Sequence, residues 1–373
     1  MQFRKAYRFR LEPKGKAYEA LLHFSGYTRF VWNWMLNQRQ ELYKATGKGT
    51  NYFNQANQLK FLKQFYPWLN DCPSQALQQS LKDLDRAYQN FFQGRAKIPK
   101  FKRRGQHDSF RIPQGIEVEG NRVKLPKLGW MKFRKSRAIE GKIKNATLSK
   151  QGKHWFISFC CEVEVKAEPH PSPSAVGIDV GIARLAMLSD GTAYDGIQLQ
   201  RRHAKKLKRL QRFFSRKRRG SANWRYSRER LLKLHIKIAN TRRDYLHKVT
   251  TEISKSHAMV FVEDLKVITM SKSGERKSNL NRMILDQSWG EFFRQLEYKQ
   301  GWLGGSLYRV DPKYTSQQCS RCGHTVQKNR KTQADFKCQQ CGYKENADLN
   351  AALNILAAGH AVLACGVIRQ VAA

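Results

Sequence analysis

The sequence predicts a multidomain α+β protein with a helical block, a small β-barrel or sandwich, and an α/β unit that carries a cysteine-rich insertion. Three observations support this fold class. The chain has 373 residues, which is more than one domain usually contains. The spacing of its apolar residues changes from helical to strand-like near Lys97. Two Cys-x2-Cys pairs then follow a region in which strand-like and helical segments alternate.

The first 95 residues combine one basic strand with helices. Residues 1–11 alternate between apolar and basic side chains, as a strand does. Residues 16–43 and 74–92 carry apolar residues at helical spacing, and Ser74 is the expected N-cap of the second helix. The polar face of this second helix presents glutamines that are candidates for reading base edges of nucleic acid. They are Gln75, Gln78 and Gln79.

The next region, residues 97–165, has the pattern of short strands joined by tight turns. It opens with a basic loop at 97–105. The expected strands are 109–112, 116–118, 122–125, 131–133, 143–148 and 155–163. Short strands at this spacing predict a small barrel or sandwich, to which residues 1–11 could add a strand.

A third region begins after a linker rich in proline and serine at 169–174. Its buried-looking apolar runs predict strands, and its long amphipathic runs predict helices. The expected strands are 176–189, 192–198, 258–265 and 306–310, and the expected helices are 201–243, 283–298 and a helix from residue 346 onward. The first helical stretch is expected to break near Gly220.

The formal net charge of +41 is the dominant compositional feature. Such a charge repels itself unless a polyanion neutralises it, so nucleic acid is the expected partner. No apolar run approaches the length of a membrane-spanning helix, so no membrane is expected. Residues 201–243 hold eighteen Lys or Arg and one acid. A basic run is often only a solvated helix face, but this imbalance favours phosphate contacts. The candidates are Arg201, Arg202, Lys205, Lys206, Arg209 and Arg212.

Three acidic residues lie in apolar surroundings in a chain that is otherwise poor in acids. Asp179 lies mid-strand beside glycines that would let another backbone approach, Glu263 ends a strand, and Asp348 starts a helix. Each acid alone has a structural explanation, such as capping. Carboxylates brought together repel unless a cation separates them, and oxygen ligands select Mg²⁺ or Mn²⁺. Two such ions support phosphodiester hydrolysis, and the order of the acids matches an RNase H-like layout.

The paired cysteines form a zinc-ribbon pattern. Cys319-x2-Cys322 and Cys338-x2-Cys341 are separated by fifteen residues. Four thiolates on two tight turns give Zn²⁺ a closed tetrahedral shell, so a structural ion is predicted and a catalytic zinc is not. Basic residues of the ribbon, among them Arg321, indicate that it faces nucleic acid. The other cysteines have no metal spacing and are expected in cores: Cys72, Cys160, Cys161 and Cys365.

The first residues lack the apolar segment of a signal peptide. This predicts a cytoplasmic protein of a prokaryote, associated with the nucleoid through DNA binding. In a reducing compartment, paired cysteines bind metal more often than they form disulfides, which agrees with the predicted zinc ribbon.

Several motifs together resemble the TnpB family, the OrfB group of transposon-encoded proteins. They are Gly177-Ile-Asp179-Val-Gly181, Val262-Glu263-Asp264-Leu265, Tyr314-Thr-Ser-Gln-Gln-Cys319-Ser-Arg-Cys322-Gly323, the pair Cys338 and Cys341, and Asn346-Ala-Asp348-Leu-Asn-Ala-Ala. The resemblance covers nearly the whole chain and extends to type V CRISPR nucleases. It implies a split RuvC-like nuclease whose triad, Asp179, Glu263 and Asp348, binds two Mg²⁺ or Mn²⁺ ions. Asp179 is expected to bridge both ions.

The resemblance also implies an order of domains. These are a wedge strand at 1–11, a helical recognition lobe at 12–95, a β-barrel wedge domain at 96–168, the RuvC-like nuclease at 169–312, the zinc ribbon at 313–344, and the rest of the nuclease at 345–373. The ribbon would thus be inserted before the third acid.

The activity that the resemblance implies is RNA-guided cleavage of double-stranded DNA. The guide RNA would come from the transposon end, the target would lie next to a short adjacent motif, and a monomer would bind one RNA. A guide–target heteroduplex of about 20 bp held through its backbone accounts for the charge. Residues 269–281 are expected to act as a lid. The alternatives are an inactive RNA-guided DNA-binding repressor, a strand-transfer transposase, and a guide-independent RNA-binding protein, which leaves the acids unexplained.

Overall fold

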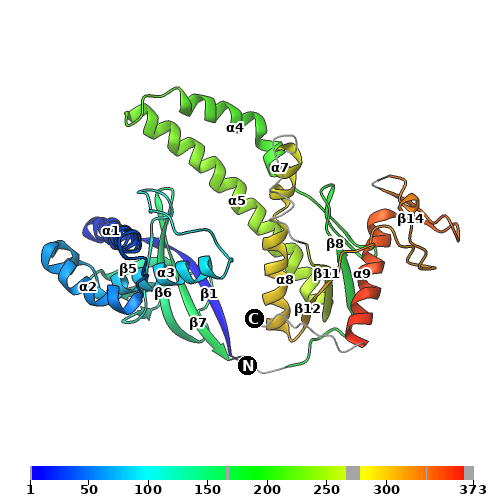
Figure 1. Cartoon of the computed structure of the whole chain (residues 1–373), viewed down its shortest axis with the longest axis horizontal. Helices are drawn as coiled ribbons and strands as arrows, with labels where there is room; N and C mark the ends of the chain where they lie inside the picture. The colour runs from blue at the N-terminus through cyan, green and yellow to red at the C-terminus, as the bar shows by residue number, and fades with distance from the viewer. Residues whose placement is uncertain (1, 165–167, 266–277, 333, 365–373) are drawn as a thin grey trace. The chain divides into compact units, whose positions relative to one another are not determined.

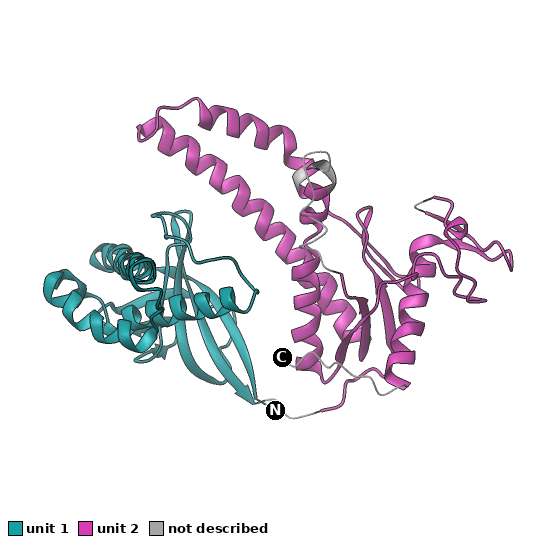
Figure 2. Cartoon of the chain, viewed as in Figure 1, with its two compact units in different colours: residues 1–165 teal, residues 166–373 magenta. Residues whose placement is uncertain are grey.

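The computed structural model describes residues 2–164, 168–265, 278–332 and 334–364. The chain forms two compact units, Met1–Val165 and Lys166–Ala373 (Figure 2). Each unit combines helices with a sheet and has its own hydrophobic core, so the α+β, multidomain class is confirmed. The finer division into six segments stays a prediction.

The first unit contains three helices. They are α1 (Gly15–Thr46), α2 (Tyr52–Phe65) and α3 (Ser74–Phe92). The sequence predicted α1 and α3 but not α2, because α2 buries only three residues and therefore lacks an apolar stripe. The predicted cap of α3 was wrong. Pro73 precedes the helix, and the Ser74 hydroxyl instead accepts a hydrogen bond from Lys63 Nζ.

The sheet of the first unit has seven antiparallel strands in the order β2-β6-β7-β1-β5-β4-β3. The strands are β1 (Gln2–Glu12), β2 (Ser109–Ile112), β3 (Glu117–Glu119), β4 (Arg122–Leu125), β5 (Gly129–Arg134), β6 (Lys142–Gln151) and β7 (His154–Glu164). The predicted contribution of the first residues is confirmed, because β1 pairs with β7 and β5. Closure into a barrel is not confirmed, since the ordered pairing leaves β2 and β3 as the two edges.

The alternation of β1 explains how this sheet acquires a core. Tyr7, Phe9 and Leu11 are buried, while the basic residues between them are not. The Phe9 ring lies 5.3 Å from that of Phe133 and 6.2 Å from that of Phe159, on the two strands that flank β1. The period-2 pattern thus places one face of β1 against the core and leaves its positive charges at the surface.

The second unit is built on a five-stranded sheet in the order β10-β9-β8-β11-β12. Its strands are β8 (Ala175–Asp179), β9 (Arg184–Leu188), β10 (Ala193–Asp195), β11 (Met259–Glu263) and β12 (Ser306–Val310). β11 runs parallel to both β8 and β12. The single strand predicted at 176–189 was wrong: β8 and β9 form a hairpin around residues 180–183. The turn is nearly as apolar as the strands, so the composition of the run did not reveal it.

Helices cover both faces of this sheet (Figure 1). The described helices of this unit are α4 (Leu199–Ser215), α5 (Ala222–Ser256), α7 (Ser278–Gln287), α8 (Trp289–Leu303) and α9 (Ala347–Ala364), of which α4 packs on α5 and not on the sheet. Side chains of α5 and α8 pack on one face, and α9 packs against β8 on the other. The predicted break near Gly220 is confirmed. The helix predicted at 283–298 was wrong, because the chain breaks at Ser288, whose φ of 57° is not helical.

The last helix, α9, is long and apolar enough by composition to cross a membrane, which the sequence analysis did not anticipate. In the structure Ala351, Ala352 and Ile355 of α9 are buried, and the helix lies against the central sheet. Its apolar composition therefore has a simple origin in core packing. Two sequence predictions, most of the lid at 269–281 and the burial of Cys365, lie outside the described residues.

Candidate functional site

Two of the three predicted acids end neighbouring parallel strands, so the prediction that Asp179 lies mid-strand was wrong. β8 and β11 pair in a register that sets Ile178 beside Val262, and the residues that follow are Asp179 and Glu263. The carboxyl ends of parallel strands lie at the same edge of a sheet, which is where ligands bind in open α/β sheets. The fold therefore brings together two carboxylates that are far apart in the sequence.

The third acid is delivered by α9. Asp348 lies in the first turn of this helix, and the side chain of Asn346, not that of Asp348, accepts the first free backbone N–H groups. Gly177 is what lets α9 lie so close to β8. A Cβ at this position would come within 2.3 Å of Ala352 O. The prediction that a glycine beside Asp179 admits another backbone is thus confirmed.

The electrostatics show that the three acids share one site. Burial, followed by the nearby charges of Glu263 and Asp348, raises the pKa of Asp179 to about 7, while Arg330 opposes the shift. Burial also raises the pKa of Glu263, and a hydrogen bond from Thr315 opposes this. Without a cation, the site therefore retains a proton near neutral pH. A bound cation would relieve the same repulsion.

Two residues of the segment between β12 and α9 contact these acids. The sequence analysis did not assign Thr315, and it placed Arg330 only among the basic ribbon residues expected to face nucleic acid. The Thr315 hydroxyl lies 2.5 Å from Glu263 Oε1, and Arg330 Nη2 lies 3.4 Å from Asp348 Oδ1. Thr315 belongs to the motif that ends in Cys319, which is the only sequence signal that could have drawn attention to it. Nothing in the spacing of Arg330 indicated an acidic partner.

The chemistry of these donors fits a divalent cation. Carboxylate oxygens are the ligands that Mg²⁺ and Mn²⁺ prefer, and the mutual repulsion of the acids calls for positive charge. Among the described residues, the four cysteines alone form a group of three or more ligand atoms within 4.8 Å of one another. The three carboxylates are therefore spaced more widely than the thiols.

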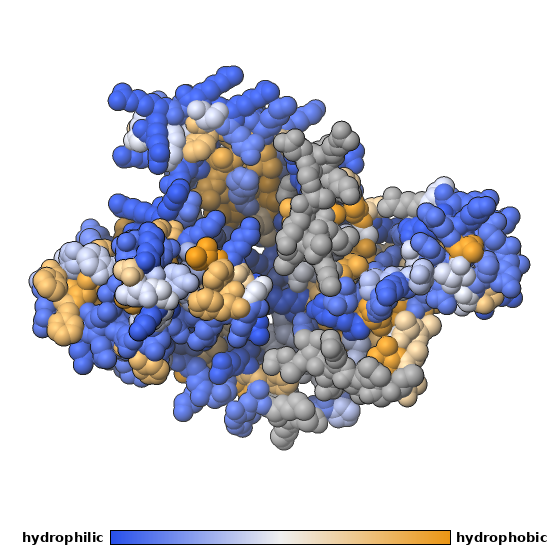
Figure 3. Space-filling model, viewed as in Figure 1, coloured by the Kyte–Doolittle hydropathy of each residue, from blue (hydrophilic) through white to orange (hydrophobic). Residues whose placement is uncertain are grey.

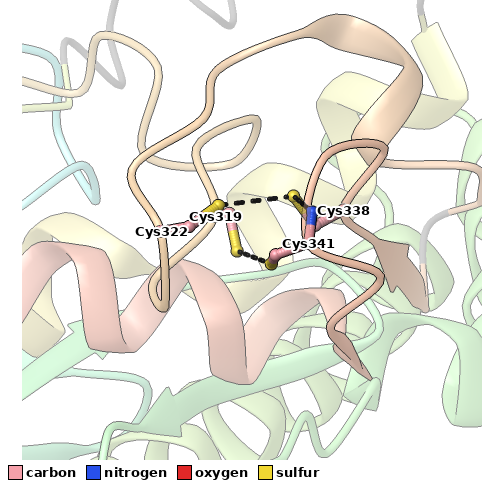
Figure 4. A group of neighbouring side chains, drawn as sticks. All are labelled: Cys319, Cys322, Cys338 and Cys341. Carbon is pink, nitrogen blue, oxygen red and sulfur yellow. Dashed lines mark hydrogen bonds between the residues drawn. The ribbon is translucent and has the colours of Figure 1, made fainter.

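The four predicted zinc ligands do come together (Figure 4). Cys319 Sγ lies 3.8 Å from Cys341 Sγ, and Cys322 Sγ lies 3.6 Å from Cys338 Sγ. Zn–S bonds of about 2.3 Å in a tetrahedron require sulfurs about 3.8 Å apart, so the spacing suits Zn²⁺. The backbone N–H of Cys341, with other groups, lowers the pKa of the Cys338 thiol, while burial and the other three thiols raise the pKa of the Cys322 thiol. A bound metal ion would replace the protons of both thiols.

The local backbone explains why the two pairs converge. Gly323 and Gly342 each follow a pair in the left-handed region, with φ of 76° and 71°. Asn329 is fully buried between the two turns. Its Nδ2 donates to Gln317 O and His324 O, and its Oδ1 accepts from the N–H of Gln339. The sequence analysis overlooked this amide, which joins the two halves of the ribbon.

The predicted nucleic-acid contacts lie at the surface of their units. On α3, Gln78 is exposed, Gln75 is partly exposed, and Gln79 donates to Asp83. Six basic candidates project from α4 into solvent: Arg201, Arg202, Lys205, Lys206, Arg209 and Arg212. Arg321 is exposed between the first two zinc ligands. Figure 3 shows hydrophilic side chains gathered over the α4–α5 hairpin. The structure leaves all these side chains accessible to a polyanion.

Comparison with known families agrees with this arrangement. A model described as "Probable transposase" matches residues 158–274, the Cas12f1-like TNB domain matches 289–355, and a helix-turn-helix domain matches 1–48. The Escherichia coli (strain K12) protein "Putative RNA-guided DNA endonuclease InsQ" is 50% identical over 98% of this chain and 95% of its own length. A Streptomyces pristinaespiralis protein with the name "Putative RNA-guided DNA endonuclease" is 31% identical over 98% of this chain and 92% of its own.

An α/β sheet with clustered acids and an inserted four-cysteine group that could hold a structural metal defines a class of protein. Within that class, the chain belongs to the TnpB family, as its identity to these relatives shows. More distantly, Cas12f1 of Sulfoacidibacillus thermotolerans is 29% identical over 54% of this chain and 49% of its own length. A solved Cas12f1–sgRNA–target DNA complex aligns with 95% of this chain and 99% of its own, at a TM-score of 0.37 and 17% identity.

Proposed function

We propose that this chain is an RNA-guided DNA endonuclease encoded by a transposable element. The observation that carries the proposal is the electrostatic coupling of Asp179 to Glu263 and Asp348 at one sheet edge. The chain is also 50% identical to the Escherichia coli protein with the name "Putative RNA-guided DNA endonuclease InsQ". Isolated acids can cap or form ion pairs, but three mutually repelling acids in a basic protein are explained by a metal site.

In this mechanism, Asp179, Glu263 and Asp348 are the ligands of two Mg²⁺ or Mn²⁺ ions. Such ions would supply an activated water and would stabilise the leaving oxygen in phosphodiester hydrolysis. Asp179 would be the central ligand of such a site, because the charges of both other acids act on its carboxylate. Arg330 adds a positive charge beside Asp348, where the negative charge of the scissile phosphate would gather. The zinc-bound cysteines have a structural role in this scheme.

The nucleic-acid partners are a guide RNA, derived from the transposon end, and a double-stranded DNA target. The net charge of +41 and the exposed basic face of α4 support phosphate contacts along such a heteroduplex. The glutamines of α3 are proposed to reach base edges of the target-adjacent motif. Accordingly, the first unit would supply the recognition lobe and the wedge domain, and the second unit the RuvC-like nuclease.

We further propose that a monomer binds one RNA and acts in the cytoplasm, close to the nucleoid. The RNA that copurifies with the chain identifies the partner, because its 3′ portion would name the target. Its stoichiometry against protein, measured by light scattering of the complex, tests the monomer.

The test of the nuclease is cleavage of a plasmid that carries the target of the copurified RNA. We expect Mg²⁺-dependent cleavage that EDTA abolishes. Asp179→Ala and Asp348→Ala should each reduce cleavage by at least about a thousandfold while retaining RNA, since loss of a metal ligand removes transition-state stabilisation and not RNA binding. The matched control is Asp195→Asn, because Asp195 is exposed at the end of β10. Cleavage that persists in the two alanine variants would refute the triad.

A second candidate is a transposase that catalyses strand transfer, favoured by the family description that matches residues 158–274. Such an enzyme also uses carboxylates and metal, so the triad does not separate the two. Dependence on element-end DNA would support strand transfer, whereas a cut position that follows the bound RNA would support the nuclease. An RNA-guided repressor without cleavage is the third outcome, and it requires target binding with an intact plasmid.

A further inference from the structure

We propose that Thr315 is a positioning residue of the carboxylate site, whose hydroxyl orients Glu263 toward the divalent cation while two buried asparagines fix the Thr315 segment to α9. This role rests on the proposed function, because it assumes that the three acids hold a divalent cation. The segment that leads into the proposed zinc ribbon would thus help to hold one of the three acids in place. Two sets of contacts and the position of Asp348 carry the proposal.

The first contact joins Thr315 to Glu263. Thr315 is buried, and its Oγ1 lies 2.5 Å from Glu263 Oε1 and 3.1 Å from Pro312 O. A hydroxyl has one proton to donate, and the shorter of the two contacts is to the carboxylate. A hydrogen bond to an ionised acceptor is the stronger kind. It therefore holds Oε1 in place, so that the other carboxylate oxygen has a fixed direction in which to meet a cation.

The second set of contacts anchors the backbone of this segment. Asn354 Nδ2 donates to Thr315 O at 2.8 Å and to Gln318 O at 2.7 Å. Asn350 Nδ2 donates to the same Gln318 O at 2.8 Å, while its Oδ1 accepts from the N–H of Ser320. Both asparagines are buried. They lie four residues apart on α9, and hence on one face of the helix.

The third observation is the position of Asp348 on that same helix. Asp348 precedes Asn350 by two residues, within the first turn of α9. The contacts thus run from Glu263 through Thr315 and Asn354 to the helix that carries Asp348. A shift of α9 along the sheet would break at least one of these buried hydrogen bonds, each of which is costly to lose. The segment therefore couples the second acid to the third.

A purely structural role for Thr315, such as filling space or closing the turn at Pro312, makes a different prediction. Valine keeps the shape of threonine and loses the hydroxyl, whereas serine keeps the hydroxyl and loses the methyl group. If packing is what matters, Thr315→Ser should be the more harmful change. If orientation of Glu263 matters, Thr315→Val should be harmful and Thr315→Ser should behave like the native chain.

The experiment measures Mn²⁺ binding to the full chain in its complex with the copurified RNA. Binding is followed by electron paramagnetic resonance, as the loss of the signal of free Mn²⁺. Asp179→Asn defines how much of the binding belongs to the acids. We expect Thr315→Val to weaken this binding about tenfold or more, as loss of a ligand's outer partner does. The Mg²⁺ concentration for half-maximal cleavage should rise in proportion, while the zinc content stays native. Thr315→Ser should restore both readouts.

Native Mn²⁺ affinity in Thr315→Val would overturn the positioning role and leave the proposed nuclease intact. Equal damage from serine and valine would also overturn it, in favour of packing. Absence of any Asp179-dependent Mn²⁺ binding in the native complex would refute the metal site itself, and the positioning role with it. The failure of the inference and that of the proposed function are thus distinct results.

Discussion

The four thiols and the three carboxylates of the second unit are two sites built in opposite ways. The thiols come from two short turns of one segment, and their sulfurs pair at 3.6 and 3.8 Å. The carboxylates come from β8, β11 and α9, and only the packing of the sheet and helix brings them together. A local site is specified by spacing along the chain, whereas a dispersed site is specified by topology. Substitutions in the two sites should therefore change the stability of different parts of the unit.

The largest effect is expected from Cys338→Ser, which removes a ligand of the local site. Structural zinc contributes about 10 kcal/mol or more to the fold of a small ribbon, so the variant should lose its zinc. Residues 319–346 should then lose amide protection in hydrogen exchange, while the five-stranded sheet keeps its own. Cys160→Ser is the control, since Cys160 lies in β7 of the other unit. Retention of zinc and of ribbon protection by Cys338→Ser would contradict the assignment.

Whereas Cys338→Ser is expected to destabilise the protein, Asp179→Asn should raise the free energy of unfolding of the metal-free protein. Because the pKa of Asp179 is raised to about 7 in the folded state, ionisation destabilises the fold as the pH rises from about 4 to 7. The amide removes this cost, which is at most about 4 kcal/mol above pH 7. Urea unfolding with EDTA at pH 4 and pH 8 measures it. If the difference in unfolding free energy between Asp179→Asn and the native protein does not grow with pH, the repulsion among the acids is refuted.

Gly177→Ala should disturb the dispersed site and spare the local one. The added methyl group meets the backbone of α9 at 2.3 Å, so the helix must move, at a cost of about 1–3 kcal/mol. Cleavage should fall with stability while the zinc content stays native. Gly290→Ala, where a Cβ meets open space in α8, is the matched control and should be neutral or slightly stabilising. A native melting temperature in Gly177→Ala would show that α9 does not lie this close.

The smallest effect is expected at Lys299. This residue is a buried charge whose hydrogen-bond partners among the described residues are neutral. It is 8% exposed, and burial lowers its pKa to about 8, although its Nζ donates to His247 O, Thr250 Oγ1 and Thr251 Oγ1. The charged form destabilises the fold below pH 8, and this cost fades as the pH rises toward 10.5. We expect Lys299→Met to raise the free energy of unfolding at pH 7 by about 1–2 kcal/mol, after allowance for solvent screening.

The gain in Lys299→Met should shrink at pH 9, as urea unfolding at the two pH values would show. Lys255→Met, at an exposed position of α5, should show no such trend. A gain that is independent of pH would mean that packing and not charge is responsible. With these controls, the four variants distinguish loss of the cysteine site in Cys338→Ser from a changed charge in Asp179→Asn and Lys299→Met and from altered packing in Gly177→Ala.

The same contrast explains what sequence reasoning could predict. The cluster of four cysteines followed from spacing alone, and strong periodicity predicted α3 from Ser74 to Phe92, as found. The helix α2 was missed because most of its surface is exposed. The turn between β8 and β9 was missed because Val180 and Ile182 are as apolar as the strands beside them. Elements were thus predicted where burial imposes a period and missed where it does not.

The acid cluster shows a different limit. Asp179, Glu263 and Asp348 stood out as acids in apolar surroundings, and the structure brings their charges together. Their partners did not stand out, because Thr315 and Arg330 are ordinary residue types in a polar segment. Hydrogen bonds such as that from Thr315 to Glu263 depend on how the ribbon docks on α9, and no local pattern encodes this. The acids were therefore predictable from the sequence, and the residues that contact them were not.

The late position of α9 in the chain also has a consequence during protein synthesis. Asp179 and Glu263 leave the ribosome well before Asp348, and the helix that covers Gly177 leaves with Asp348. Domains generally begin to fold from the N-terminal side while the chain grows. Any product terminated before α9 has two acids and basic helices, but neither the third acid nor the helix that packs on β8. Under the proposed function, prematurely ended chains should therefore bind nucleic acid but lack the complete proposed nuclease site.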